Sequence, residues 1–203
     1  MATIDDKPSL LDPNSRRGPT RRAVLEPALV FALVPPVQVL AQTLNTAPEK
    51  LRPQPGDHLV FAFGASEGKL LQPEELVLGA APVTALPMSS DTGVIRNGSR
   101  LNRVMVMRLA PTVLSAKTAR GAADGVVAYS AVCSHTGCDV SEWNTETNRL
   151  ACPCHDSEFE VTDGARVMSG PAPKPLAMLP LEIIGGELRV ARGFTRRVGA
   201  QPQ

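Results

Sequence analysis

The sequence is poor in aromatic residues, since Phe, Trp and Tyr together make up only 3% of its 203 residues. A core built on large aromatic side chains is therefore excluded. With 19 Pro and 16 Gly, the composition favours a small loop-rich β protein over a helical bundle. A strong charge of either sign is also missing, because the formal net charge is +1. Nothing global in the composition therefore indicates a nucleic-acid partner or a polybasic membrane surface.

The sequence also lacks an unbroken apolar stretch of bilayer-spanning length. The apolar run from Ala28 to Ala41 contains two adjacent prolines and covers about 14 residues, whereas a spanning helix needs about 20. Arg21 and Arg22 precede this run, an order typical of a twin-arginine signal segment, here residues 1–41. We therefore expect export to the periplasm, with membrane association only if this segment is retained.

The remainder of the chain divides into three expected parts. Residues 42–56 are rich in Pro and predict an extended linker, residues 57–193 predict one domain, and residues 194–203 predict a C-terminal tail. Short Val-rich and Leu-rich segments with Gly and Pro between them predict a β-sandwich or small barrel.

Local patterns predict several elements within this domain. The turn pair Gly185-Gly186 predicts a hairpin, because favoured hairpin turns require positive φ angles. A short helix is predicted over residues 111–120, with Gly121 ending it. Strands are predicted over residues 57–63, 101–109, 125–132, 181–184 and 187–191.

Cysteine and histidine are scarce, yet they are concentrated in one segment. All four Cys and two of the three His lie within 23 residues, in a Cys-Ser-His-Thr-Gly-Cys motif that begins at Cys133 and a Cys-Pro-Cys-His motif that begins at Cys152. Two thiolates and two imidazoles could also bind zinc, but zinc sites favour C-x2–4-C pairs, and two cysteines would be left over. A disulfide pair alone would not need histidine. The pattern therefore argues against both of these readings.

The two motifs resemble those of the Rieske family, which read C-x-H-x2-C and, after a loop, C-x2-H with a cysteine inside the second motif. The match is close over residues 133–157 and loose over residues 57–193. The resemblance implies an all-β fold, a Rieske-type antiparallel β-sandwich or small barrel with an inserted cluster-binding subdomain at about residues 132–174. It also implies one [2Fe–2S] cluster as the cofactor.

The resemblance further implies a role for each residue of the motifs. Cys133 and Cys152 would ligate an inner iron, whereas His135 and His155 would ligate an outer iron that takes the electron. Neutral imidazoles in place of thiolates raise the reduction potential. The resemblance also implies a disulfide between Cys138 and Cys154. It further implies a proline-rich loop that shields the cluster, formed by Gly170, Pro171, Ala172 and Pro173.

Residues that follow the second motif are expected to tune the potential. Ser157 stands where respiratory Rieske proteins have a serine that donates to a cluster sulfur and raises the potential. Phe159 occupies a position often held by a tyrosine donor, and Asp156 replaces the usual glycine and adds a negative charge. We therefore expect a potential below that of a family member with both Ser and Tyr.

Three classes of function follow from the resemblance. We expect an exported electron-transfer subunit, similar to the small subunit of arsenite oxidase, that passes single electrons from a partner oxidoreductase to a c-type cytochrome or similar acceptor. The alternative is the iron–sulfur subunit of a quinol:cytochrome c oxidoreductase, and such a subunit needs a lasting membrane anchor. A Rieske oxygenase or its ferredoxin is disfavoured, because only His58 remains for a second iron site and such ferredoxins usually lack the export signal.

Local charge indicates how a partner could dock. Residues 139–163 contain a single basic residue, Arg149, and seven acidic ones: Asp139, Glu142, Glu146, Asp156, Glu158, Glu160 and Asp163. This acidity is typical of a solvated face, and it also predicts salt-sensitive docking to a basic surface on a large oxidoreductase subunit or a c-type cytochrome. Because the sequence contains no phosphate-binding loop and no nucleophile elbow, we expect an electron-transfer subunit rather than a free-standing enzyme.

Overall fold

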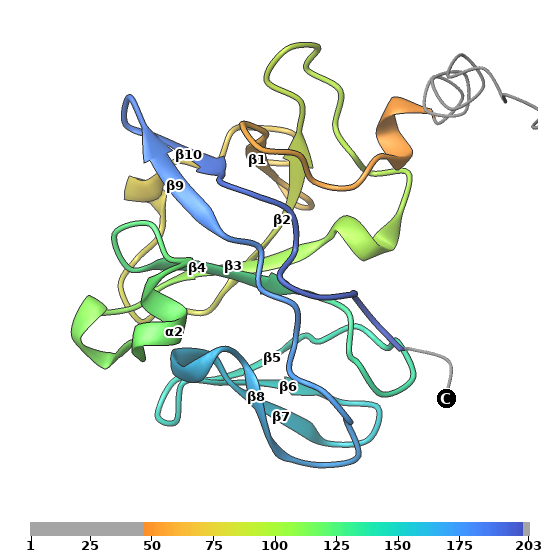
Figure 1. Cartoon of the computed structure of the whole chain (residues 1–203), viewed down its shortest axis with the longest axis vertical. Coiled ribbons are helices and arrows are strands. Elements are labelled where there is room, and N and C mark those ends of the chain that lie inside the picture. Colours follow the sequence, from red (N-terminus) through yellow and green to blue (C-terminus); the bar gives the residue numbers. More distant parts are fainter. Residues whose placement is uncertain (1–46, 201–203) are drawn as a thin grey trace, which may run out of the picture.

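A computed structural model describes residues 47–200, so the predicted signal segment 1–41 lies outside the described residues. The larger sheet has six antiparallel strands in the order β4-β3-β2-β1-β10-β9 (Figure 1). Its strands are β1 (His58–Phe61), β2 (Val83–Met88), β3 (Val104–Arg108), β4 (Val126–Ser130), β9 (Leu181–Ile184) and β10 (Glu187–Val190). The predicted strands and the hairpin at Gly185-Gly186 are therefore present.

A second, four-stranded antiparallel sheet is inserted in the chain between β4 and β9, and it lies beneath the first sheet in Figure 1. Its strands follow one another as a meander: β5 (Glu142–Asn144), β6 (Arg149–Cys152), β7 (Ser157–Glu160) and β8 (Arg166–Ser169). The predicted all-β fold with an inserted subdomain is confirmed.

The larger sheet curls until its two edges meet. The amide of Ser130 in β4 donates to the carbonyl of Ala177 over 2.8 Å, and the amide of Leu179 donates to Ala128 over 2.9 Å. These bonds join β4 to the segment just before β9, so that paired strands leave few unsatisfied backbone groups at the edges. The chain consequently leaves the barrel at β4, forms the inserted sheet and returns beside the strand that it left.

Helices are few and short. They are η1 (Pro48–Lys50), η2 (Pro73–Glu75), η3 (Arg100–Asn102), η4 (Pro111–Val113), α2 (Ala116–Ala119) and η5 (Val161–Asp163). The helix predicted over residues 111–120 is divided into η4 and α2, because Leu114 is extended and Ser115 starts a new helix by accepting from the amide of Thr118. No helix within residues 47–200 is long and apolar enough to span a membrane.

Two buried clusters fill the protein. One lies inside the barrel and is formed by side chains such as Leu59, Val106 and Leu188. The other lies between β3, β4 and the inserted sheet, and it contains Tyr129 and Phe159, both fully buried. The hydroxyl of Tyr129 donates to the carbonyl of Val161 over 2.8 Å, so a hydrogen bond as well as apolar contact joins the inserted sheet to the barrel.

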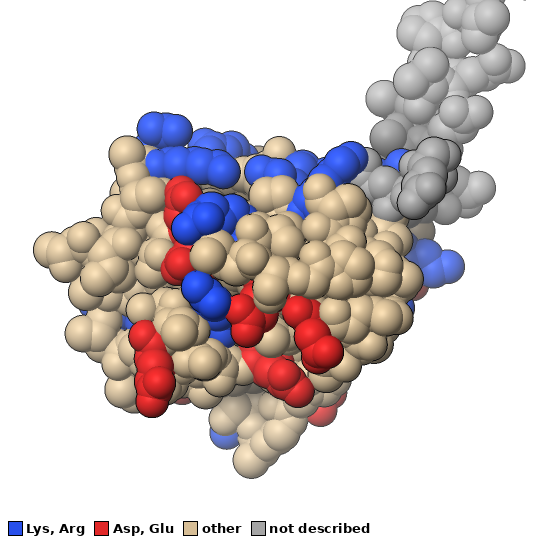
Figure 2. Space-filling view, turned by 90° about the horizontal axis from the view of Figure 1, so that it is seen from below, with Lys and Arg blue, Asp and Glu red and all other residues tan. Residues whose placement is uncertain are grey.

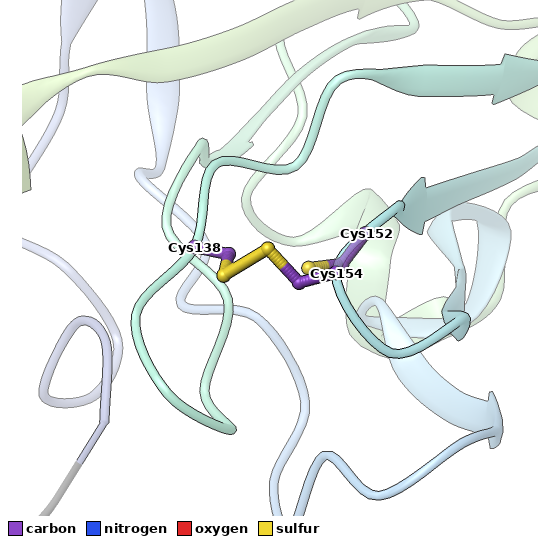
Figure 3. A group of neighbouring side chains, drawn as sticks. All are labelled: Cys138, Cys152 and Cys154. Carbon is purple, nitrogen blue, oxygen red and sulfur yellow. A yellow bond between two sulfur atoms is a disulfide. The ribbon is translucent and has the colours of Figure 1, made fainter.

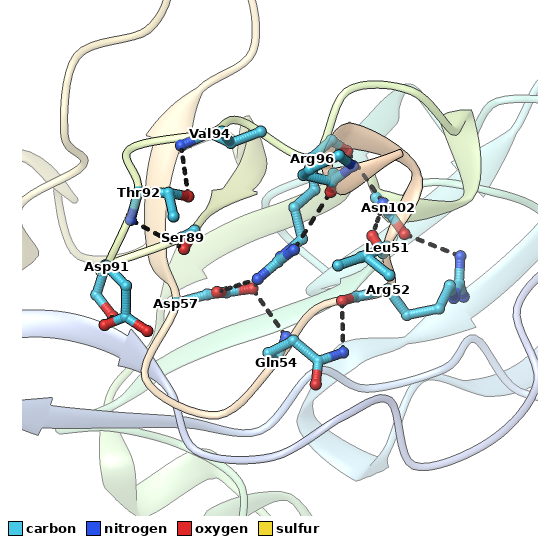
Figure 4. A network of polar contacts seen from close by, with 12 residues as sticks. Leu51, Arg52, Gln54, Asp57, Ser89, Asp91, Thr92, Val94, Arg96 and Asn102 are labelled. Carbon is cyan, nitrogen blue, oxygen red and sulfur yellow. Dashed lines mark hydrogen bonds and ion pairs between the residues drawn. The ribbon is translucent and has the colours of Figure 1, made fainter. Parts of the chain in front are cut away.

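The described part of the predicted linker, residues 47–56, packs on the barrel instead of extending from it. Arg52 donates to the side chain of Asn102 over 3.0 Å, and the amide of Gln54 donates to Asp57 over 2.8 Å (Figure 4). Asp57 in turn forms a buried ion pair with Arg96, at 2.6 Å and 2.8 Å. The sequence pattern missed the contacts of Arg52 and Arg96 because their partners lie 50 and 39 residues away along the chain.

The segment expected to be a C-terminal tail is also packed as far as residue 200. The amide of Thr195 donates to the carbonyl of Met178 over 2.9 Å, and Val198 is buried beside Val132. This segment therefore lies along the strand end that leads into Cys133.

Candidate metal centre

Two buried thiols mark the region where the barrel meets the inserted sheet. Cys133 follows β4 by three residues, and its amide donates to the carbonyl of Cys138 over 2.8 Å, which closes the first loop. Cys152 is the last residue of β6 and pairs with Ser157, the first residue of β7. Both cysteines belong to the apolar cluster between the two sheets, with exposed fractions of only 1% and 2%.

A disulfide joins the two loops near these thiols. Cys138 is bonded to Cys154, the pairing that the resemblance implies, and Figure 3 shows the disulfide beside Cys152. The sulfur atoms of these three cysteines lie within 4.8 Å of one another. Two of them are bonded to each other and therefore offer no thiolate, so they do not form a metal site with Cys152.

The two histidines of the motifs lie against each other and are more exposed than the two thiols. The ring centroids of His135 and His155 are 4.6 Å apart, with the planes at 84°. His155 is exposed and His135 is half-buried, whereas both thiols are buried. Nδ1 of His135 is buried and has no hydrogen-bond partner among the described residues. A buried ring nitrogen without a partner is costly unless it ligates a metal, so this atom fits a ligand position.

The environment of Cys133 also fits a metal thiolate. The pKa of the Cys133 thiol is raised to about 11, chiefly by burial and also by the neighbouring Cys152 thiol. Hydrogen bonds from the His135 backbone and the Ser157 side chain act in the opposite direction. Donors are thus already directed at this sulfur, and a bound cation would further favour its thiolate form.

The loop formed by Gly170, Pro171, Ala172 and Pro173 closes over the second motif. The amide of Ala172 donates to Oγ of Ser157 over 3.1 Å. Gly170 has φ +79°, and a Cβ on it would lie 2.5 Å from Cα of Ser157, so only glycine allows this approach. The hydroxyl of Ser134 bonds the carbonyl of Lys174 over 2.6 Å, which ties the same loop to the first motif.

The positions expected to tune the potential are placed differently from one another. Ser157 and Phe159 are buried with exposed fractions of 1% and 0%, and they share the core region with the two thiols. Asp156 is exposed as the last residue of the β6–β7 turn, where its φ is +54°. This left-handed conformation gives a physical reason for a glycine at the same position of the family motif.

The first loop is held by two arginines that the sequence pattern did not identify. The guanidinium of Arg103 donates to both carboxylate oxygens of Asp139, at 2.9 Å and 3.1 Å. Arg100 donates to the same carboxylate over 3.1 Å and also to the carbonyl of Gly137. The arginines lie more than 30 residues before the loop, so no local spacing could have indicated this contact.

Known proteins match the sequence of both the site and the surrounding domain. The family description "Rieske [2Fe-2S] domain" matches residues 96–180. A cytochrome bc1 complex Rieske iron-sulfur subunit from Streptomyces lividans is 32% identical over 162 residues, which cover 73% of this chain and 94% of that protein. The chain belongs to the Rieske family. As a Rieske protein it binds one [2Fe–2S] cluster and transfers electrons.

Other relatives of this Rieske protein differ in length. A bc1 Rieske subunit from Streptomyces coelicolor is also 32% identical over 73% of this chain, yet the chain spans only 45% of that protein. A putative respiratory nitrate reductase Rieske subunit from Haloferax mediterranei is 45% identical over 37% of this chain and 34% of its own length. These names indicate subunits of respiratory complexes, and they do not support the expected kinship with an arsenite-oxidase small subunit.

Proposed function

We propose that this Rieske protein is the iron–sulfur subunit of a quinol:cytochrome c oxidoreductase of the bc1 type. The observation that carries the proposal is the similarity to the S. lividans bc1 Rieske subunit, which extends over 94% of that protein and therefore beyond the cluster motifs. The subunit passes single electrons to an acceptor such as a c-type cytochrome. It acts within an oxidoreductase complex and carries no independent catalytic residue.

Cys133, Cys152, His135 and His155 form the proposed ligand set. The two buried thiols hold the inner iron and the two imidazoles hold the outer iron, with Nδ1 of His135 as the ligating atom of that residue. When bound, the cluster supplies a site that accepts and releases one electron. The exposed ring of His155 marks the surface at which a redox partner approaches.

Charge on residues 139–163, which include most of the inserted sheet, supports docking to a basic partner. Three of the seven acidic residues in this segment, Asp139, Glu158 and Asp163, form ion pairs with arginines of this chain. The other four form no ion pair within residues 47–200 and stay available to an acceptor: Glu142, Glu146, Asp156 and Glu160. Opposite charges steer the encounter and make its rate depend on ionic strength.

Purification of the tagged full chain from membranes of its native organism, in mild detergent, tests the proposed complex. We expect a b-type and a c-type cytochrome to co-purify with the chain, and we expect quinol to reduce the cluster in the purified complex. Co-purification with a molybdenum-containing subunit and without cytochrome b would overturn the bc1 assignment, while leaving the Rieske family in place.

Export remains part of the proposal. Residues 1–41 have the order of a twin-arginine signal, and the Cys138–Cys154 disulfide is typical of an oxidising compartment. Because a bc1-type subunit needs a lasting membrane anchor, N-terminal sequencing of the protein recovered from membranes is expected to begin at Met1 or Ala2. A chain that begins at Gln42 would show that the segment is removed after export and would count against the bc1 assignment.

The Phe159→Tyr variant is expected to raise the reduction potential. Phe159 is fully buried in the cluster of side chains that contains both thiols, and tyrosine would add a donor to this region. A hydrogen bond that favours the reduced state by about 1 kcal/mol corresponds to roughly 40 mV for one electron. Redox titration of the full chain measures the shift. Phe61→Tyr adds a hydroxyl in β1 and serves as the control. An unchanged or lower potential in Phe159→Tyr contradicts the expectation that residue 159 tunes the potential of the cluster.

The Asp156→Gly variant is expected to raise both stability and potential. Glycine relieves the left-handed backbone at this position, which is worth up to about 1 kcal/mol, and it removes a negative charge that opposes reduction. Asp156→Asn removes only the charge, because asparagine tolerates the same conformation about as well as aspartate. We therefore expect redox titration to show a rise in both variants and thermal unfolding to show a gain in the glycine variant alone.

A further inference from the structure

Two hollows lie side by side along the C-terminal segment of the described chain. The first has a volume of about 430 Å³ and lies between residues 52–53, the η3 region and residues 193–198. The second, of about 200 Å³, lies between α2, Gly164 and residues 192–196. Arg196 lines both hollows, so they adjoin at this side chain and together make up one neighbouring surface region.

This surface, which we call the basic face, is lined by six cationic side chains and by no acidic one within the described residues. Figure 2 shows Lys and Arg side chains gathered along one edge of the molecule, while most Asp and Glu side chains lie elsewhere. The cationic residues of the basic face are Arg52, Lys117, Arg120, Arg192, Arg196 and Arg197.

These cations have few partners of their own. None of the six forms an ion pair within residues 47–200, and Asp163, the acidic residue next to Gly164, is paired with Arg166 over 3.1 Å. Nε of Arg196 is buried and has no hydrogen-bond partner among the described residues. The basic face therefore has unused donors and uncompensated positive charge, which favour an anionic ligand.

The side chains that line the first hollow indicate which chemical class of anion it would bind. Leu101, Phe194 and Val198 line it together with the arginines, and the guanidinium of Arg52 lies 5.2 Å from the centre of the Phe194 ring. Guanidinium groups match phosphate oxygens in planar, bidentate geometry. A phosphate attached to an apolar body, as in a phospholipid, fits both the charge and the apolar wall.

The sequence upstream favours a lipid over an acidic protein. The apolar run that ends at Ala41 lies 11 residues before Arg52, so an extended chain between them spans at most about 40 Å. A bilayer that holds this run would bring its headgroups within reach of the basic face. The run is short and is interrupted by prolines, and such weak apolar attachment becomes stable when a basic surface is added.

We propose that the basic face binds the phosphate headgroups of anionic phospholipids and attaches the domain to a membrane surface. Binding orients the protein with the C-terminal segment toward the bilayer. It uses none of the proposed cluster ligands and does not depend on which complex the subunit joins.

Partition of the full chain between buffer and vesicles tests the proposal. Vesicles of phosphatidylcholine alone are compared with vesicles containing about 30% phosphatidylglycerol, and the ratio of the two partition coefficients is the measured quantity. This ratio cancels the apolar contribution of the N-terminal run. We expect the Arg192→Gln/Arg196→Gln variant to lower the ratio at least about tenfold. The control Lys69→Gln/Arg108→Gln removes the same charge outside the basic face, and it should keep the ratio within about twofold.

A second variant and a second ligand make the outcome decisive. Arg192→Lys/Arg196→Lys keeps the charge and should retain most of the preference for phosphatidylglycerol, even if the glutamine variant is less stable. Equal ratios for the glutamine variant and its control overturn the proposal. The proposal is also overturned if the glutamine variant keeps its preference for phosphatidylglycerol vesicles but loses salt-sensitive binding to an acidic protein surface. The basic face would then bind a protein partner.

Discussion

The His155→Gln variant is expected to lose the EPR signal of the reduced cluster, whereas the same replacement of His58 leaves the signal unchanged. His155 is exposed and lies against His135, and an amide is a poor substitute for imidazole as an iron ligand. His58 is the one histidine of the sequence outside the two motifs. It lies in β1, and its Nδ1 is 4.0 Å from the carboxylate of Glu187.

Iron and acid-labile sulfide are measured in the same samples. The expected result is about two irons per chain in the wild type and the His58 variant, and a large loss in the His155 variant. Because metal binding is coupled to folding, circular dichroism of the His155 variant shows whether the barrel persists without the cluster. Full iron content together with an unchanged EPR signal in His155→Gln would remove this residue from the ligand set.

The local motifs carried most of the information about this site, because the proposed ligands of each pair are close in sequence. Cys133 and His135 lie in one tight loop, and Cys152 and His155 lie at one hairpin, so spacing alone brings each pair together. The hairpin turn at Gly185 and Gly186 was likewise predictable from neighbouring residues, and their φ angles of +61° and +87° are those that such a turn requires. Such features depend on a few neighbouring residues and can be predicted from a pattern.

Contacts between distant segments could not be predicted in this way. The two arginines that hold Asp139 lie on η3 and at its end, and a surface arginine in a sequence carries no sign of its partner. The close approach of Gly170 to Ser157 depends on how the third loop folds over the second motif. The composition of residues 42–56 is typical of a linker, and the packing of residues 47–56 follows from specific partners on the barrel.

The Arg96→Met variant is expected to lower the free energy of unfolding by about 3–5 kcal/mol, the usual cost of leaving a buried charge without its partner. Arg96 and Asp57 have exposed fractions of 5% and 3%, and two hydrogen bonds of 2.6 Å and 2.8 Å join their side chains. The hydrogen bond to Asp57 raises the pKa of Arg96, although burial opposes the rise, so the pair is stable in its charged form. Methionine fills a similar volume but leaves the Asp57 carboxylate uncompensated.

Urea unfolding of the full chain measures this loss, and two further variants identify its cause. Arg108→Met breaks an ion pair with Asp124 that is largely open to solvent, so it should cost less than about 1 kcal/mol. Asp57→Leu/Arg96→Met removes both charges and should recover most of the lost stability, because no unpaired charge remains. If the double variant is as unstable as Arg96→Met, then the loss comes from the hydrogen bonds that hold residues 47–56 to the barrel, from the amide of Gln54 to Asp57 and from Arg96 to the carbonyl of Pro48, and not from an unpaired charge.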